Sequence, residues 1–116
     1  MPRRLVPADP AAVSDALARW RSGGADRADL KLLVKHYLAL LQERAPGASV
    51  EVRVPPYAAV QVVEGVRHTR GTPPAVVETD ADTWLRLATG ESPWGSEPRV
   101  SVSGERTDLS PYLPLR

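Results

Sequence analysis

The sequence contains no cysteine and no phenylalanine among its 116 residues. The absence of cysteine excludes disulfide bonds, thiol catalysis and thiolate metal sites. No apolar run approaches the roughly 20 residues that a transmembrane helix needs. We therefore expect a chain without a transmembrane segment, and a cytoplasmic location is the default expectation.

The sequence also lacks a large excess of charge of either sign, because it has 15 basic and 14 acidic residues and a net charge of +1. Such a balance gives no broad field to attract a phosphate backbone, so no nucleic-acid partner is expected. Hydrophobic residues make up 42% and charged residues 25%, which is ordinary for a globular protein. The length predicts a single domain over residues 1–116.

Helical patterns occupy the first 47 residues. Residues 1–8 are predicted to form a flexible tail, and Asp9-Pro10 then combines an N-cap with a proline at the first helical position. Apolar residues recur at helical spacing until Gly23-Gly24. A second helix is expected over about 27–44, before Pro46-Gly47. Its apolar stripe consists of Leu30, Leu33, Val34, Tyr37, Leu38 and Leu41.

The pattern changes to alternation with period two from residue 48. In SVEVRV the three valines share one face, which predicts a half-buried strand, and Pro55-Pro56 then predicts a bulge or a turn. YAAVQVV is a second expected strand. After a turn at Glu64-Gly65, VRHTR is expected to return as a third strand, and AVVET is a fourth.

A third helix is predicted in DADTWLRLATGE, with Asp80 as its cap and Gly90 at its end. RVSVSG is the last expected strand, with Val100 and Val102 inward, and TDLSPYLPLR is a terminal turn or short helix. Strands in mid-chain with helices before and after imply an α+β fold. We therefore expect a five-stranded, mostly antiparallel or mixed sheet with helices packed on one face.

Two stretches of the C-terminal half, AVVETDADTWLRLATGE and RVSVSGERTDLSPYLPL, carry a family pattern. A strand ends at an acidic residue that caps a helix, with Trp84 near the helix start and Thr89-Gly90 at its end. A strand leading into Gly104 then precedes a terminal helix. This arrangement resembles the sterol carrier protein type 2 family of lipid-binding domains. VEVRVPPYAAVQVVEGVRHTRGTPP resembles a bacterial branch of that family, so the likeness covers roughly residues 48–116.

The resemblance implies a lipid-binding fold without chemistry of its own. In that family an apolar tunnel between a five-stranded sheet and the C-terminal helices holds acyl chains, sterols or other lipids. Related modules also accompany thiol-dependent isomerases, in which a separate helical domain carries the metal. For this sequence the resemblance implies an apolar cleft between sheet and helices. The expected lining is Val52, Val60, Val62, Val77, Trp84, Leu87, Val102, Leu109, Tyr112 and Leu113.

Two departures from the family pattern affect the elements that wall the tunnel. The family has an extra helix between the T-G end of the helix and the last strand, whereas only ESPWGSEP stands there in this sequence. The terminal segment is short and holds Pro111 and Pro114, which a helix interior does not tolerate. A reduced pocket is therefore one of the hypotheses.

Candidate catalytic and metal-binding residues are few. His36 and His68 are the only imidazoles, and we interpret His36 as a residue that flanks the apolar stripe of the second helix. No HxxxH or HxH spacing occurs, so no metal and no cofactor is predicted. Glu78, Asp80 and Asp82 gather at a helix start, where capping accounts for carboxylates without catalysis. With no G-x-S-x-G motif either, the sequence does not predict an enzyme.

The most basic stretch is VRHTRGTPP, residues 66–74, which places Arg67, His68 and Arg70 within four positions. These three residues are a candidate polar rim of the apolar cleft. The favoured interpretation is an edge strand, where basic residues discourage aggregation between sheet edges. The sequence leaves open whether His68 and Arg70 face a ligand or solvent.

Three hypotheses follow for function. The first is non-enzymatic binding of a lipid or other apolar small molecule in the cleft between sheet and helices. The second is an interaction or regulatory module with a reduced pocket, which would meet a protein partner or form a homodimer. The third is an accessory domain to a thiol-dependent isomerase encoded elsewhere.

Overall fold

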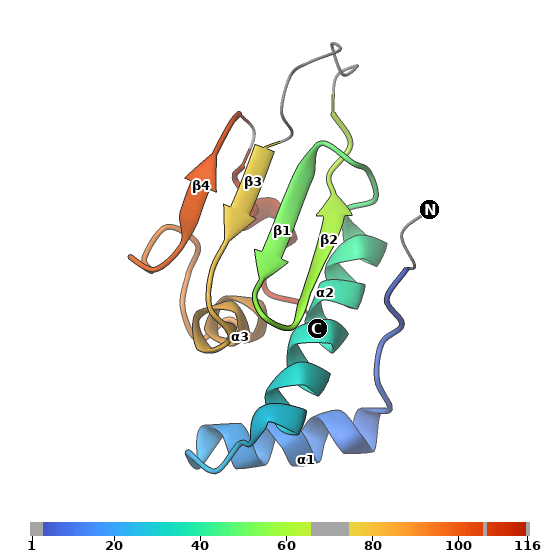
Figure 1. The fold of residues 1–116 in the computed structure, drawn as a ribbon, viewed down its shortest axis with the longest axis vertical. Coiled ribbons are helices and arrows are strands. Elements are labelled where there is room, and N and C mark those ends of the chain that lie inside the picture. Colours follow the sequence, from blue (N-terminus) through green and yellow to red (C-terminus); the bar gives the residue numbers. More distant parts are fainter. Residues whose placement is uncertain (1–3, 66–74, 106, 116) are drawn as a thin grey trace.

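The computed structural model of the chain describes residues 4–65, 75–105 and 107–115. Figure 1 shows one mixed sheet with helices packed against it, and with α1 lying across the N-terminal end of α2. In chain order the elements are α1 (Pro10–Arg21), α2 (Arg27–Arg44), β1 (Val50–Val54), β2 (Ala58–Val62), β3 (Ala75–Glu78), α3 (Ala81–Thr89), β4 (Ser101–Ser103) and the 3-10 helix η1 (Ser110–Tyr112). The α+β class predicted from the sequence is confirmed.

The sheet has the strand order β2-β1-β3-β4. β1 pairs with β2 in antiparallel and with β3 in parallel orientation, and β4 pairs with β3 in antiparallel orientation, so the sheet is mixed. The turn between β1 and β2 is closed by the Tyr57 N–H, which donates to the Val54 carbonyl at 2.9 Å. Pro55-Pro56 therefore forms a hairpin turn. Of the two predicted alternatives, a bulge or a turn, the turn is confirmed.

The prediction of five strands is wrong for the described part of the chain, where the sheet has four. β2 ends at Val62 because Val63 adopts a φ of 67°, and its N–H donates to the Ala45 carbonyl at 2.7 Å instead of continuing the ladder. The chain thus leaves the sheet before the expected turn at Glu64-Gly65. The segment predicted as the fifth strand, residues 66–70, lies outside the described residues.

One face of the sheet is buried and the other is polar. The register places Val52 opposite both Val60 and Val77, so their side chains share the face that the helices cover. The opposite face carries Arg53, whose guanidinium pairs with carboxylates of β1 and β3. Val102 belongs by register to the covered face, yet it is 50% exposed. Val102 therefore lies on the predicted face but is not buried in the core, because β4 is an edge strand whose residues all remain exposed.

Side-chain caps set the helix starts. The Asp9 carboxylate accepts from the Ala12 N–H at 3.2 Å, as the sequence predicts for an N-cap. At the start of α2, Asp26 and Asp29 accept from each other's backbone N–H groups and form a capping box. Asp80 caps α3 by accepting from the Thr83 N–H at 3.3 Å. These local contacts explain why the three predicted helices lie where the sequence placed them.

The segment before α1 lies along α2. Its Leu5 N–H donates to Gln42 Oε1 at 3.1 Å, and its Ala8 N–H donates to His36 Nδ1 at 2.9 Å. The imidazole is thus held as a neutral acceptor, and burial lowers the pKa of His36 below its ordinary value. His36 has a structural contact, in agreement with its interpretation as a helical residue that flanks the core.

Candidate functional site

Most residues of the predicted apolar lining form the packed core instead of an open wall. Seven of them are at most 5% exposed, and all of these except Leu87 belong to the core cluster. Tyr112 and Leu113 are partly buried against this core, and Val102 lies apart on the edge strand. The predicted lining thus has seven buried members. These are Val52, Val60, Val62, Val77, Trp84, Leu87 and Leu109.

Residues 107–115 cross over α3, and we call them the C-terminal segment. Leu109 and Leu115 are buried and anchor it at both ends. The Leu115 N–H donates to the Ala88 carbonyl at 2.7 Å, and Arg44 donates to the carbonyls of Tyr112 and Pro114 at 3.1 and 2.7 Å. Few polar contacts therefore hold a segment that lies directly over the apolar core.

A cleft of about 480 Å³ opens between the C-terminal segment, the end of α3 and the loop that follows it. We call it the C-terminal cleft. It brings together Leu87 and Leu113 of the predicted lining with apolar residues that the sequence argument missed. Its lining is Leu87, Gly90, Ser92, Pro93, Trp94, Ser110, Leu113 and Pro114. The missed signal was the pair Pro93-Trp94, two apolar residues in a loop otherwise composed of small and polar ones.

Trp84 carries an unpaired donor inside the core. Its side chain is 1% exposed, and Nε1 has no hydrogen-bond partner among the described residues. A buried donor without an acceptor costs about 1–3 kcal/mol. Trp84 lies one helical turn before Leu87, which lines the C-terminal cleft.

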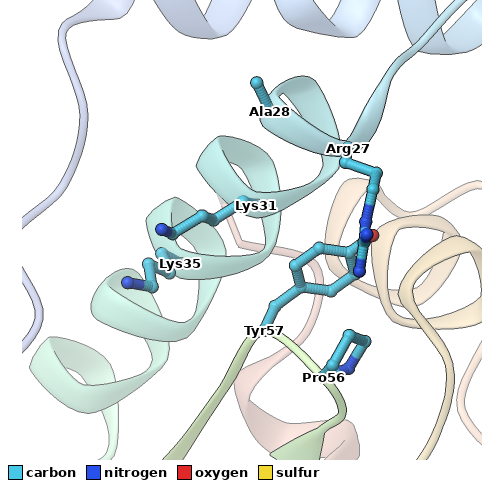
Figure 2. A pocket seen from close by; sticks show the side chains of 6 residues that line it. All are labelled: Arg27, Ala28, Lys31, Lys35, Pro56 and Tyr57. Carbon is cyan, nitrogen blue, oxygen red and sulfur yellow. The ribbon is translucent and has the colours of Figure 1, made fainter.

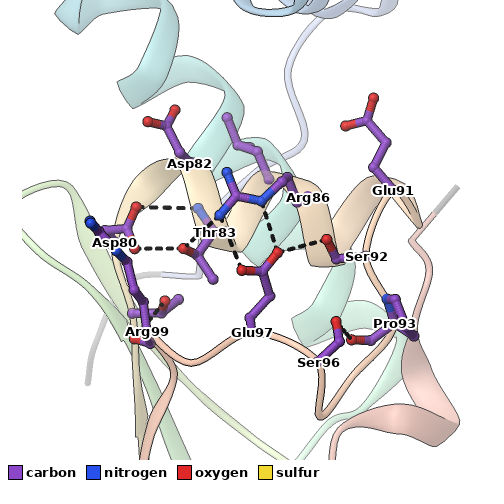
Figure 3. Close-up of polar contacts among 12 residues, drawn as sticks. Asp80, Asp82, Thr83, Arg86, Glu91, Ser92, Pro93, Ser96, Glu97 and Arg99 are labelled. Carbon is purple, nitrogen blue, oxygen red and sulfur yellow. Dashed lines mark hydrogen bonds and ion pairs between the residues drawn. The ribbon is translucent and has the colours of Figure 1, made fainter.

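A polar network fixes the loop that forms the outer wall of the cleft (Figure 3). Arg86 of α3 donates from Nε and Nη2 to the two carboxylate oxygens of Glu97, at 2.8 and 3.2 Å. The Ser92 hydroxyl donates to the same carboxylate at 2.6 Å. The hydrogen bonds from Arg86 and Ser92 lower the pKa of Glu97 to about 2. The loop is thereby tied to the helix that carries Leu87.

The network also accounts for the acidic residues at the start of α3. The Thr83 hydroxyl donates to Asp80 at 2.6 Å and accepts from Arg86 Nη2 at 3.1 Å, which links the cap of α3 to the loop (Figure 3). Asp82 accepts from Trp20 Nε1 at 2.9 Å. These contacts agree with the interpretation of Asp80 as a capping residue.

The predicted polar rim, Arg67, His68 and Arg70, lies outside the described residues. In the ranges that are described, no three His, Asp or Glu side chains lie together as metal ligands would. None of the helices in those ranges is long and apolar enough to cross a bilayer.

The comparison with family models decides the relationship of the chain. The model described as "bacterial SCP ortholog" matches residues 26–115, from the cap of α2 to the end of the C-terminal segment. The chain belongs to this family. No curated protein matches the sequence. The SCP match contains the sheet, α3 and every residue of the C-terminal cleft, whereas α1 precedes it.

Proposed function

We propose that this domain binds a lipid or another apolar small molecule without catalysing a reaction, and that the ligand occupies the C-terminal cleft. The observation that carries the proposal is the apolar wall of Leu87, Leu113 and Trp94 around a volume of about 480 Å³. Ligand sites in proteins typically have volumes of about 300–1,000 Å³ and mostly apolar linings. The resemblance of the chain to lipid-binding sterol carrier domains supports the same function.

The C-terminal segment is the element that would move to admit a longer ligand. Its own Leu109 is buried in the core, in the same cluster as residues that the sequence predicted as lining. Displacing the segment costs the hydrogen bonds of Arg44 and Ala88, and it exposes the apolar face of α3 to the ligand. In this proposal only the longest ligands would contact the buried valines of the sheet.

The apolar lining of the cleft supports a preference for ligands with one neutral polar group. An ionised group would have a large desolvation cost against this lining, whereas the cost for a hydroxyl or carbonyl oxygen is much smaller. We therefore expect long-chain alcohols, esters or sterol-like molecules to bind more tightly than fatty acid anions of equal length.

The test is a Leu113→Gln variant, titrated with an uncharged, environment-sensitive acyl probe. Leu113 is partly buried at the rim of the cleft, so the change removes apolar contact without a charge and without emptying the core. Losing about 1 kcal/mol of contact weakens binding about fivefold.

The matched control is Val6→Gln, which makes a similar change at a residue that is 79% exposed and does not line the cleft. We expect the control to bind like the wild type, with thermal unfolding confirming that both variants fold. Equal affinities for the two variants, or no binding by the wild type, would contradict the proposal. The interaction-module hypothesis depends on Arg67, His68 and Arg70 and stays a prediction.

A further inference from the structure

A second cleft, of about 390 Å³, lies between the N-terminal half of α2 and the turn that joins β1 to β2. Figure 2 shows Tyr57 of the turn beside Arg27, whereas the side chains of Lys31 and Lys35 extend from α2 on the side away from Tyr57. We call it the basic cleft. Arg44, which holds the C-terminal segment, stands at the other end of α2, so the two clefts are separate sites. The lining of the basic cleft is Arg27, Ala28, Lys31, Lys35, Pro56 and Tyr57.

The cations of the basic cleft are placed on one face of α2. Arg27, Lys31 and Lys35 follow one another at intervals of four residues, which corresponds to steps of about 6 Å along the helix axis. Like charges at this spacing destabilise a helix. Among the described residues, none of the three forms an ion pair, and none of the residues that line the cleft is acidic. The three positive charges therefore repel one another, and an anion bound in the cleft would reduce this repulsion.

The nearest carboxylates on α2 are engaged elsewhere. Asp26 caps the helix, and Asp29 accepts two hydrogen bonds from Arg19 of α1 at 2.8 and 2.9 Å. The sequence has only two lysines, Lys31 and Lys35, and both line this cleft. Both lysines of the sequence thus belong to the lining of this cleft.

The charge of the lining suits a ligand with more than one negative charge. We propose that the basic cleft binds a phosphate-bearing anion. A phosphate ester carries between one and two charges and three strong acceptor oxygens, enough to engage neighbouring ammonium and guanidinium groups together. The ring and hydroxyl of Tyr57, which is partly buried, close the cleft on the side of the sheet.

Two sources could supply this chemistry, a soluble phosphate compound or the headgroup of an anionic lipid. The cleft is formed by two elements that face each other, which favours a ligand group that enters it. The site stands independently of the apolar cleft, because the two share no lining residue.

The test uses the two lysines as reporters. Reductive methylation with ¹³C-formaldehyde preserves their positive charge and gives each lysine a separate NMR signal. We expect inorganic pyrophosphate or ADP to shift both lysine signals with one saturable affinity. If only vesicles that contain phosphatidylglycerol shift them, and pure phosphatidylcholine vesicles do not, the phosphate belongs to a lipid headgroup. If neither soluble phosphates nor anionic vesicles shift the signals, the proposal is overturned.

Calorimetry on charge variants of the unmodified protein provides the second reading. The double variant Lys31→Gln, Lys35→Gln is expected to lose affinity for the active probe by tenfold or more. The control Arg21→Gln, Arg53→Gln removes the same net charge from ion-paired residues outside the basic cleft, and it should change the affinity less than twofold. An equal loss in both variants would show a general charge effect and overturn the site.

Discussion

At the scale of single residues, Gly90 links the end of α3 to the C-terminal segment. It ends the helix with a φ of 86°, in the left-handed region that favours glycine. A Cβ at this position would lie 3.1 and 3.3 Å from two side-chain carbons of Pro114. The residue is therefore constrained by its backbone conformation and by its neighbour in the C-terminal segment.

We predict that Gly90→Ala destabilises the protein more than Gly95→Ala. Gly95 has a similar φ of 92°, but a Cβ there meets nothing within 4 Å. Both changes carry the left-handed penalty of about 1–2 kcal/mol, and only Gly90→Ala also pushes against Pro114. Chemical unfolding of both variants measures the difference.

Hydrogen exchange locates the effect. The Leu115 amide bonds to Ala88 beside this contact, so it should exchange faster in Gly90→Ala and at the wild-type rate in Gly95→Ala. Indistinguishable stabilities and exchange rates in the two variants would show that Pro114 does not restrain this position.

At the scale of elements, the pair of Arg86 and Glu97 joins α3 to the loop before β4. The pKa of Glu97, lowered to about 2 from 4.5, makes this link sensitive to acid. Because the folded-state pKa is lowered, the contribution to stability is present above about pH 4.5 and is lost as the pH falls toward 2.

We therefore predict that Glu97→Gln is less stable than the wild type at neutral pH and that the difference disappears by about pH 2. Thermal unfolding between pH 2 and 7 measures it. Glu91→Gln, which alters an ion pair between exposed side chains at 3.3 Å, serves as the control and should differ little from the wild type at any pH. A difference for Glu97→Gln that stays constant down to pH 2 would show that its charge does not hold the loop.

The elements that the sequence predicted correctly are those with local causes. Asp9, Asp80 and Gly90 cap helices through contacts within a few residues, and the alternation in Val50–Val54 reflects one buried face. The errors have nonlocal causes. Val102 alternates like a core residue, yet its exposure depends on β4 being an edge strand. The end of β2 at Val62 depends on the bond from Val63 to Ala45, which the turn signal at Glu64-Gly65 does not contain.

Some residues of the candidate site could be selected from the sequence, but their arrangement around the cleft could not. The family resemblance selected Leu87 and Leu113, which line the C-terminal cleft, and Trp84, which lies in the core. Which of the selected residues fill the core and which face the cleft depends on the path of the C-terminal segment over α3. That path is set by contacts such as Arg44 to Pro114, 70 positions apart in sequence, which no local pattern contains.

At the scale of the whole molecule, a closed apolar core adjoins a shallow apolar cleft, with a basic cleft at the other end of α2. The core packs sheet valines against α2 and α3, and the C-terminal segment covers it from the side of α3. In our proposal, ligand binding is an exchange in which an apolar chain replaces part of the contact between this segment and α3. Affinity should then follow the apolar area that the ligand buries.

A chain-length series of uncharged ligands tests this central claim most directly. Primary alcohols of increasing length would be titrated against the wild-type protein by displacement of the acyl probe. The account predicts that binding strengthens by about 0.8 kcal/mol, roughly fourfold in Kd, for each added methylene until the cleft is filled. Affinities that do not change with chain length, or no displacement at any length, would contradict binding of an apolar ligand by this domain.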